Sequence, residues 1–191
     1  MFKLNSVLML GMLAAMNPVQ AEEHRELGAH EHGHGTLNIA IEGNAINMEL
    51  DIPGADIVGF EHDAETAEQK AMLDRAKAAL ARPLELFVLP TTAACSVSEV
   101  KVDVRGEHDE HDAAAKQSGK TENHAAEAHH NEFHATYALA CKAPAEVTSI
   151  GFDFFKQFKN AQELDVNVVT GKAQSKFEVT RDKPVISLKG L

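Results

Sequence analysis

The sequence lacks an apolar run long enough to cross a membrane, and basic residues are scarce. Its most apolar stretch, residues 7–16, spans ten residues, whereas a transmembrane helix needs about 20. The chain has 18 lysines and arginines against 29 aspartates and glutamates, a formal net charge of −11. This balance argues against nucleic acid and anionic lipid as partners and favours attraction of cations. We expect no nucleic-acid partner and no stable membrane insertion.

Cysteine is also scarce, because the chain has only Cys95 and Cys141. Neither belongs to a Cys-x-x-Cys pair, which argues against a thioredoxin-like redox site. In an exported protein an isolated pair usually forms a disulfide. The alternative is a pair of thiolate zinc ligands. A bond between the two would close a loop around the His-rich part of the chain, stabilising the fold by about 4 kcal/mol in the chain-entropy model.

Nucleotide-binding and nucleophilic motifs are missing as well. There is no GxGxxG, no P-loop and no evident Ser-His-Asp or Cys-His arrangement. A zinc-dependent hydrolase would need three fixed ligands, an open position and a placed general base. Glu61, beside His62, is the candidate for such a base. We predict that the protein is not an enzyme and keep the zinc-dependent hydrolase as an alternative.

The N-terminal residues 1–21 are predicted to be a signal peptide. Lys3 supplies the positive start, Pro18 breaks the apolar run, and Ala21 ends a stretch suited to signal peptidase cleavage. An N-terminal membrane anchor is the alternative, but nothing extends the run. No cysteine follows it, which argues against a lipoprotein anchor. Residues 22–191 are then predicted to form a single zinc-binding domain.

What the chain has in excess is histidine, with eleven residues between His24 and His134. Neutral imidazole and carboxylate oxygens are ligands that zinc takes in tetrahedral sites. A structured site is predicted from some of His32, His34, His62 and His134, with Glu61 as fourth ligand or as a partner of a ligand. A structural histidine bonded to backbone is the alternative for His62 and for His134. His30, His32 and His34 alternate with other residues, so in an extended chain their side chains share one face, and all three are candidate zinc ligands.

Residues 106–131 have no large apolar side chain and are rich in His, Ala, Asp, Glu and Lys. This composition predicts a mobile, disordered His-rich loop between two strands. Such a ligand pool pays ordering entropy on each capture, so we expect weaker and faster-exchanging binding than at the structured site. Its candidate ligands are His108, His111, His124, His129 and His130.

The ligand types do not select one ion, because copper(II) and nickel bind similar sets. A copper or nickel chaperone is therefore an alternative to a zinc protein. Only Met48 and Met72 follow the predicted signal peptide, and this scarcity argues against a copper(I) site. A module in which the histidines sense protons is a third interpretation.

The apolar pattern predicts an α+β fold with a mainly antiparallel sheet and two helices. Alternation over residues 37–41 and 46–52, around a turn at 42–44, indicates a β-hairpin. Helical spacing predicts a helix over residues 63–81, capped by Asp63 or Thr66, and a shorter one over 154–161. Further strands are predicted at 84–89, 97–105, 133–141, 147–152, 164–169, 173–180 and 185–188.

Four motifs in a fixed order resemble a known family. They are HEHGHG (residues 30–35), LNIAIEG (37–43), GFEH (59–62) and HATYALAC (134–141). Together they are similar to the ZrgA family of proteobacterial zinc uptake proteins, over essentially all of residues 22–191. The resemblance implies a periplasmic protein that binds several zinc ions and assists high-affinity zinc import. It also implies a partner, the solute-binding protein of the zinc ABC transporter.

Overall fold

A computed structural model of the chain describes residues 33–106 and 130–191. The predicted signal peptide and most of the predicted His-rich loop lie outside the described residues. The elements, in chain order, are β1 (His34–Glu42), β2 (Ala45–Pro53), α1 (Gly54–Val58), α2 (Ala67–Leu80), α3 (Pro83–Leu86), β3 (Phe87–Val88), β4 (Cys95–Arg105), β5 (Glu132–Cys141), β6 (Ser149–Phe152), α4 (Phe154–Gln157), β7 (Glu163–Thr170), β8 (Gln174–Thr180) and β9 (Val185–Ser187).

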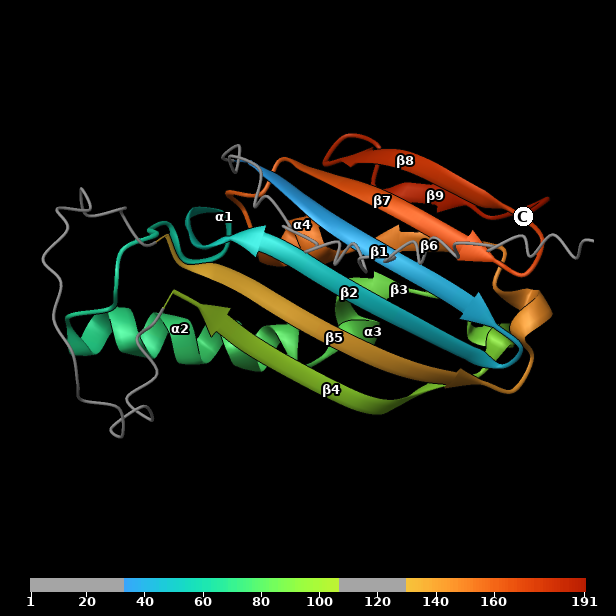
Figure 1. The fold of residues 1–191 in the computed structure, drawn as a ribbon, viewed down its shortest axis with the longest axis horizontal. Coiled ribbons are helices and arrows are strands. Elements are labelled where there is room, and N and C mark those ends of the chain that lie inside the picture. The colour runs from blue at the N-terminus through green and yellow to red at the C-terminus, as the bar shows by residue number, and fades with distance from the viewer. Residues whose placement is uncertain (1–32, 107–129) are drawn as a thin grey trace, which may run out of the picture.

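Six strands form the main sheet, in the order β4-β5-β2-β1-β7-β8 (Figure 1). Neighbours pair antiparallel except β1 and β7, which run parallel. The predicted hairpin is β1–β2, with Ile39 opposite Met48. A second, three-stranded sheet has the order β3-β6-β9. The predicted mainly antiparallel sheet is therefore confirmed, in a fold that is mostly β and whose main sheet is mixed through one parallel pair that the sequence did not indicate.

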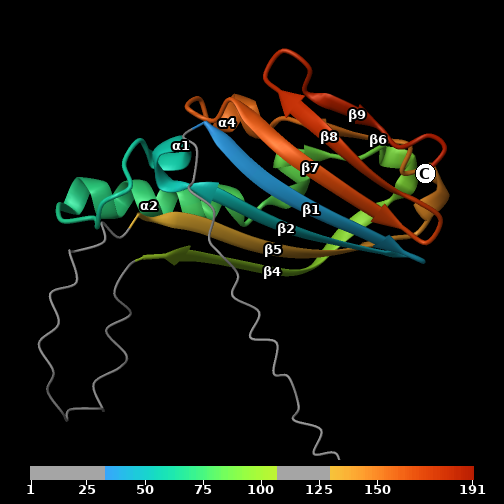
Figure 2. The ribbon, with the colours of Figure 1, turned by 45° about the horizontal axis from the view of Figure 1, so that its top comes forward.

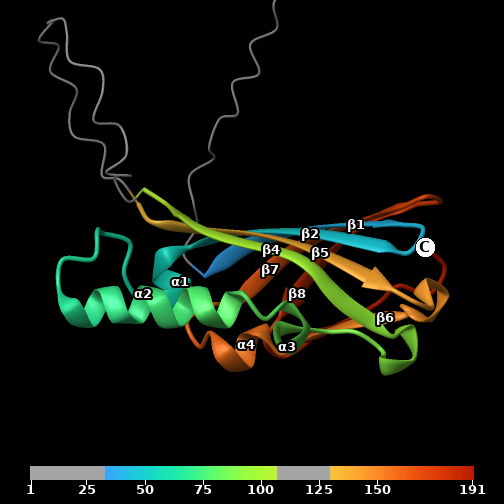
Figure 3. The same ribbon diagram turned by 90° about the horizontal axis from the view of Figure 1, so that it is seen from below.

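The helices and the small sheet cover one face of the main sheet. Figure 3 shows α1, α2, α3 and α4 on the same side, and Figure 2 shows the long strands curving over them. Side chains that point to this side are mostly buried on β1, β2, β5 and β7 and half-buried on the edge strands β4 and β8. The opposite face carries no described element. Aromatic rings fill the space between the layers, with Phe87 contacting Phe152, Phe154 and Tyr137. The main sheet thus has one core face and one open, polar face.

The long helix α2 begins where a capping box forms. The Thr66 hydroxyl accepts the backbone N–H of Gln69, and the Gln69 side chain accepts the backbone N–H of Thr66. This reciprocal pair satisfies two amide groups that a helix start otherwise leaves unpaired. Of the two predicted caps, Thr66 is therefore the one used. Within the described residues, no helix is long and apolar enough to span a membrane.

The predicted strand over residues 84–89 is wrong in its first half. Pro83 occupies the first turn of α3, and only Phe87 and Val88 pair as a strand. Proline suits the first turn of a helix because its fixed φ is helical and the missing N–H is not needed there. The described residues contain four helices instead of two, but α1, α3 and α4 have only five, four and four residues. The predicted helix over residues 154–161 is α4, which ends earlier than expected at Gln157. The turns α1 and α3 are too short to give the apolar repeats by which a sequence indicates a helix.

Cys95 and Cys141 form a disulfide, as predicted for an isolated pair. They are register partners at one end of β4 and β5, and Arg105 pairs with Glu132 at the other end. The bond therefore joins two neighbouring strands of the sheet. Both thiols are used in the bond, so the alternative of two thiolate ligands does not apply to this structure.

Tyr137 is the only tyrosine of the chain, and it lies in the core of the fold. Its hydroxyl is buried and has no hydrogen-bond partner among the described residues. Burial disfavours the charged phenolate and raises the pKa of Tyr137 above its ordinary value of about 10. The unfolded chain therefore releases this proton first, and the contribution to stability is lost as pH rises from about 10 toward the folded-state pKa.

We predict that Tyr137→Phe removes this part of the alkaline loss of stability. At neutral pH the unfolding free energy should stay equal or rise by up to about 1 kcal/mol, because an unpaired buried hydroxyl is removed. Phenolate absorbance of the unmodified protein measures the ionisation directly, since no other tyrosine contributes. Phenolate forming near pH 10 in a chain that is still folded would contradict the prediction.

Candidate metal centre

The four described histidines gather at one end of the main sheet. His34 is the first residue of β1, and His130 and His134 lie on either side of the start of β5. His62 lies next to the same point, because the side chain of Asn131 donates to the His62 carbonyl at 2.8 Å. The two ranges outside the described residues adjoin the same end, next to Gly33 and between Gly106 and His130. All histidines of the described residues therefore lie toward this end of the sheet.

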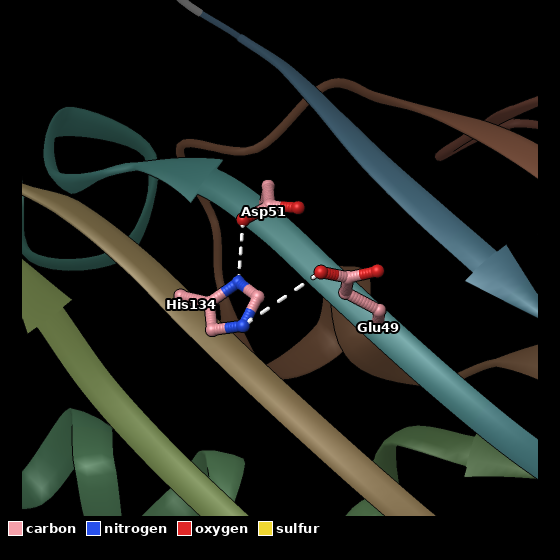
Figure 4. A group of neighbouring side chains, drawn as sticks. All are labelled: Glu49, Asp51 and His134. Atoms are coloured by element: carbon pink, nitrogen blue, oxygen red, sulfur yellow. Dashed lines mark hydrogen bonds and ion pairs between the residues drawn. The ribbon is translucent and has the colours of Figure 1, made fainter. Parts of the chain in front are cut away.

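His134 is held on the open face of β5 with its side chain 12% exposed. Its register partners are Asp51 on β2 and Asp103 on β4. The Nδ1 atom lies 2.6 Å from Oδ1 of Asp51, a hydrogen-bond distance (Figure 4). Strand pairing on both sides and this bond fix the orientation of the imidazole.

Glu49 completes the group from the same strand as Asp51. It lies two residues earlier on β2, so both carboxylates point to the open face. Its Oε1 lies 3.8 Å from Nε2 of His134, on the other side of the ring from Asp51 (Figure 4). One ligand atom from each residue lies within 4.8 Å of the others, and the described part of the chain has no second group of three such side chains.

Two cations adjoin this group. Arg105 lies 3.3 Å from Oδ1 of Asp51, and Lys101 lies 2.7 Å from Asp103. The hydrogen bond from Lys101, followed by smaller contributions of nearby positive charge, lowers the pKa of Asp103 below its ordinary value although partial desolvation opposes this. Glu49 has no lysine or arginine ion-pair partner within residues 33–106 and 130–191. Among the described residues it is therefore the carboxylate of the group that has neither a lysine nor an arginine beside it.

An imidazole nitrogen and carboxylate oxygens that lie this close together are ligand types that suit zinc. Three side chains can supply at most three ligands in this arrangement, which leaves a position for water or for another donor. The site is partly open to solvent, since the Glu49 side chain is 40% exposed.

Glu61 and His62 belong to a neighbouring loop and do not enter this group. Glu61 pairs through Oε2 with Nδ1 of His130 at 2.9 Å. His62 stacks on Phe60, and its Nδ1 lies 2.8 Å from the backbone oxygen of the next residue. The two side chains predicted to act together therefore have different partners.

Asn131 ties this loop to the start of β5. It is 1% exposed, its backbone N–H donates to the Glu61 carbonyl at 2.7 Å, and its side chain donates to the His62 carbonyl. Its own carbonyl accepts the N–H of Gly54 at 2.7 Å. One buried residue thus positions the loop that carries Glu61 and His62.

His34 lies 3.6 Å from Glu163 across the parallel pair β1–β7 and is half exposed. Residues 30–34 also have the His-Glu-x-x-His spacing, which binds zinc in hydrolases when both histidines share one helix face. His34 begins a strand, and Gly33 has a φ of +90°. The helical context that this spacing requires is therefore absent at its second histidine.

The structure brings His134 together with two residues that the sequence did not suggest. His34, His62 and Glu61 lie outside the group around His134, and His130 pairs with Glu61. Glu49 and Asp51 looked like ordinary polar positions of an alternating strand, because nothing local indicates that β2 pairs with β5. The predicted ligands that lie outside the described residues are His30, His32, His108, His111, His124 and His129.

The sequence of the chain matches the model of one protein family. The model described as "ZrgA family zinc uptake protein" matches residues 29–188, most of the chain. The resemblance drawn from the four motifs is thereby confirmed. The family description names zinc uptake and no catalysed reaction. The comparison with curated proteins finds no match.

We predict that Asn131→Ala lowers the unfolding free energy by about 1–3 kcal/mol, because the His62 carbonyl loses its buried donor. Urea denaturation measures the change. Asn160→Ala is the matched control, since Asn160 also donates to a carbonyl, that of Ala55, but at an exposed position. A loss at Asn131 no larger than the loss at Asn160 would contradict the importance of this buried bond.

Proposed function

This chain belongs to the ZrgA family of zinc uptake proteins, and we propose that it collects and buffers zinc in the periplasm for high-affinity import. In this proposal it delivers the ion to the solute-binding protein of a zinc ABC transporter and catalyses no reaction. The observation that carries the proposal is the group of Glu49, Asp51 and His134, whose ligand atoms lie within 4.8 Å of one another. Zinc here is the cargo of the protein.

The periplasmic location is supported by two features of the chain. Residues 1–21 have the composition of a signal peptide. Cys95 and Cys141 are joined, and disulfides persist mainly in oxidising compartments such as the periplasm. Both features agree with a protein that meets zinc before it crosses the inner membrane.

Two tiers of binding follow from where the ligands lie. The group around His134 is held by paired strands, so little ordering entropy is lost when an ion binds there. The remaining predicted ligands supply a second, weaker tier with faster exchange. They are His30, His32, His34, His62, His108, His111, His124, His129 and His130. The formal charge of −11 attracts cations toward both tiers.

We predict that calorimetric titration with zinc resolves the two tiers. His134→Ala should remove about one tight ion and keep the weaker ones. Replacing His108, His111, His124 and His129 by glutamine should remove weaker ions and keep the tight one. Both variants retain the full chain and the buried Asn131, so the fold itself is not cut.

Lys176→Gln, on the open face but outside the group, is the control for a general charge effect. An unchanged number of tight ions in His134→Ala would remove the structured site. Most nitrogen and oxygen sites bind copper(II) more tightly than zinc. A preference for copper(II) or nickel over zinc that exceeds this general trend, at equal free-ion concentration, would favour the chaperone alternative.

Transfer to the solute-binding protein is a separate prediction. When zinc-loaded protein is mixed with the metal-free solute-binding protein, zinc should pass faster than the dissociation rate measured with a small chelator. Direct transfer needs a protein–protein encounter, so its rate should rise with the concentration of the acceptor. If the transfer rate equals the spontaneous dissociation rate at every acceptor concentration, the protein buffers zinc but does not deliver it directly.

A further inference from the structure

We propose a division of labour within the zinc site: Nε2 of His134 and the Glu49 carboxylate bind the ion, whereas Asp51 is a positioning residue and Arg105 moderates it. This assignment deepens the proposed function and rests on it. The reverse assignment, with Nδ1 and Asp51 as ligands and Glu49 as the outer partner, is the alternative that the geometry disfavours.

The first argument is the two distances from the imidazole. Zinc lies about 2.0–2.2 Å from nitrogen and oxygen ligands, so two ligands at a tetrahedral angle are about 3.3 Å apart. Nε2 of His134 and Oε1 of Glu49 are 3.8 Å apart and need only a small closure to hold an ion between them. Nδ1 and Oδ1 of Asp51, at 2.6 Å, are already in hydrogen-bond contact and would have to separate.

The second argument concerns the proton. An ionised carboxylate can only accept hydrogen bonds, so Nδ1 of His134 must be the donor to Asp51. In a neutral imidazole this leaves the lone pair on Nε2, on the side of Glu49 (Figure 4). Histidines that bind metals commonly donate their other N–H to a carboxylate, which fixes the tautomer and strengthens the ligand.

The third argument is the placement of the cations. Oδ1 of Asp51 receives Arg105 at 3.3 Å as well as the imidazole at 2.6 Å. Its charge is therefore shared by two donors and is less available to a metal ion. Glu49 has no lysine or arginine ion-pair partner among the described residues, so its carboxylate can meet a dication without displacing a cation.

Arg105 then has a predictable effect on affinity. Because Arg105 also contacts Oδ1 of Asp51, it weakens the hydrogen bond between Asp51 and Nδ1 of His134. Its positive charge also repels the arriving metal ion. Removing the guanidinium should strengthen zinc binding, whereas removing the carboxylate charge of Asp51 should weaken it. Opposite signs at two residues in mutual contact are not expected from a purely structural role.

The test uses the full chain, labelled with ¹⁵N at histidine and titrated with ¹¹³Cd²⁺ as a spectroscopic substitute for zinc. We expect metal–nitrogen coupling at Nε2 of His134 and a protonated Nδ1. Coupling at Nδ1 would overturn the assignment but keep the site. No coupling at either nitrogen, together with an unchanged number of tight zinc ions in His134→Ala, would overturn the proposed site and this assignment with it.

Affinities measured on the His134 resonance complete the test. Asp51→Asn should lower zinc affinity by about 10–100-fold with the coupling still at Nε2, as for other outer partners. Glu49→Gln should lower it by a larger factor. Arg105→Gln should raise it roughly three- to fivefold. Lys176→Gln, the matched loss of one positive charge on β8, should change it little, since three strands separate β8 from β5.

The results that would overturn the assignment are defined by the same variants. A greater loss for Asp51→Asn than for Glu49→Gln would make Asp51 the ligand. Weaker binding in Arg105→Gln would show that Arg105 supports the site and does not moderate it. Equal changes in Arg105→Gln and Lys176→Gln would reduce its effect to the general charge of the open face.

Discussion

The register between β2 and β5 is the constraint on which the rest of this structure depends. It places Asp51 opposite His134 on the open face and Leu50 opposite Ala135 in the core. Because side chains alternate along a strand, a slip of one residue would bury the polar set and expose the apolar set. The apolar packing that fixes this register therefore also fixes the positions of the candidate metal ligands on the open face.

The open face has an electrostatic character that follows from its being uncovered. Carboxylates on neighbouring strands can lie side by side there because water and nearby lysine or arginine side chains screen them. Lys176 pairs with Asp165 and Lys101 with Asp103, both on this face. Glu49 has no such partner in the described part of the chain, so its carboxylate beside His134 can meet a cation without first displacing a lysine or arginine.

Sequence reasoning found what local pattern controls and missed what distant pairing controls. The alternation around Tyr137 and the cap at Thr66 were readable because each depends on residues a few positions apart. The disulfide was readable because only two cysteines exist. The partnership of Asp51 with His134 joins residues 83 positions apart, and nothing near either residue encodes it. The parallel pairing of β1 with β7 was missed for the same reason. His134 was a candidate ligand because of its residue type and its place in an alternating strand. The carboxylates beside it could be identified only once the order of the strands in the sheet was known.

The disulfide between Cys95 and Cys141 has an evolutionary consequence. It closes one end of the β4–β5 pair, while Gly106 and His130 lie at the other end, where the intervening stretch departs and returns. The pairing of the two strands is thereby secured independently of what the stretch between them contains. Insertions, deletions and changes of histidine number in that stretch carry little penalty for the sheet. The number of histidines between the two strands can therefore change in evolution without a change in the strand pairing that holds Asp51 opposite His134.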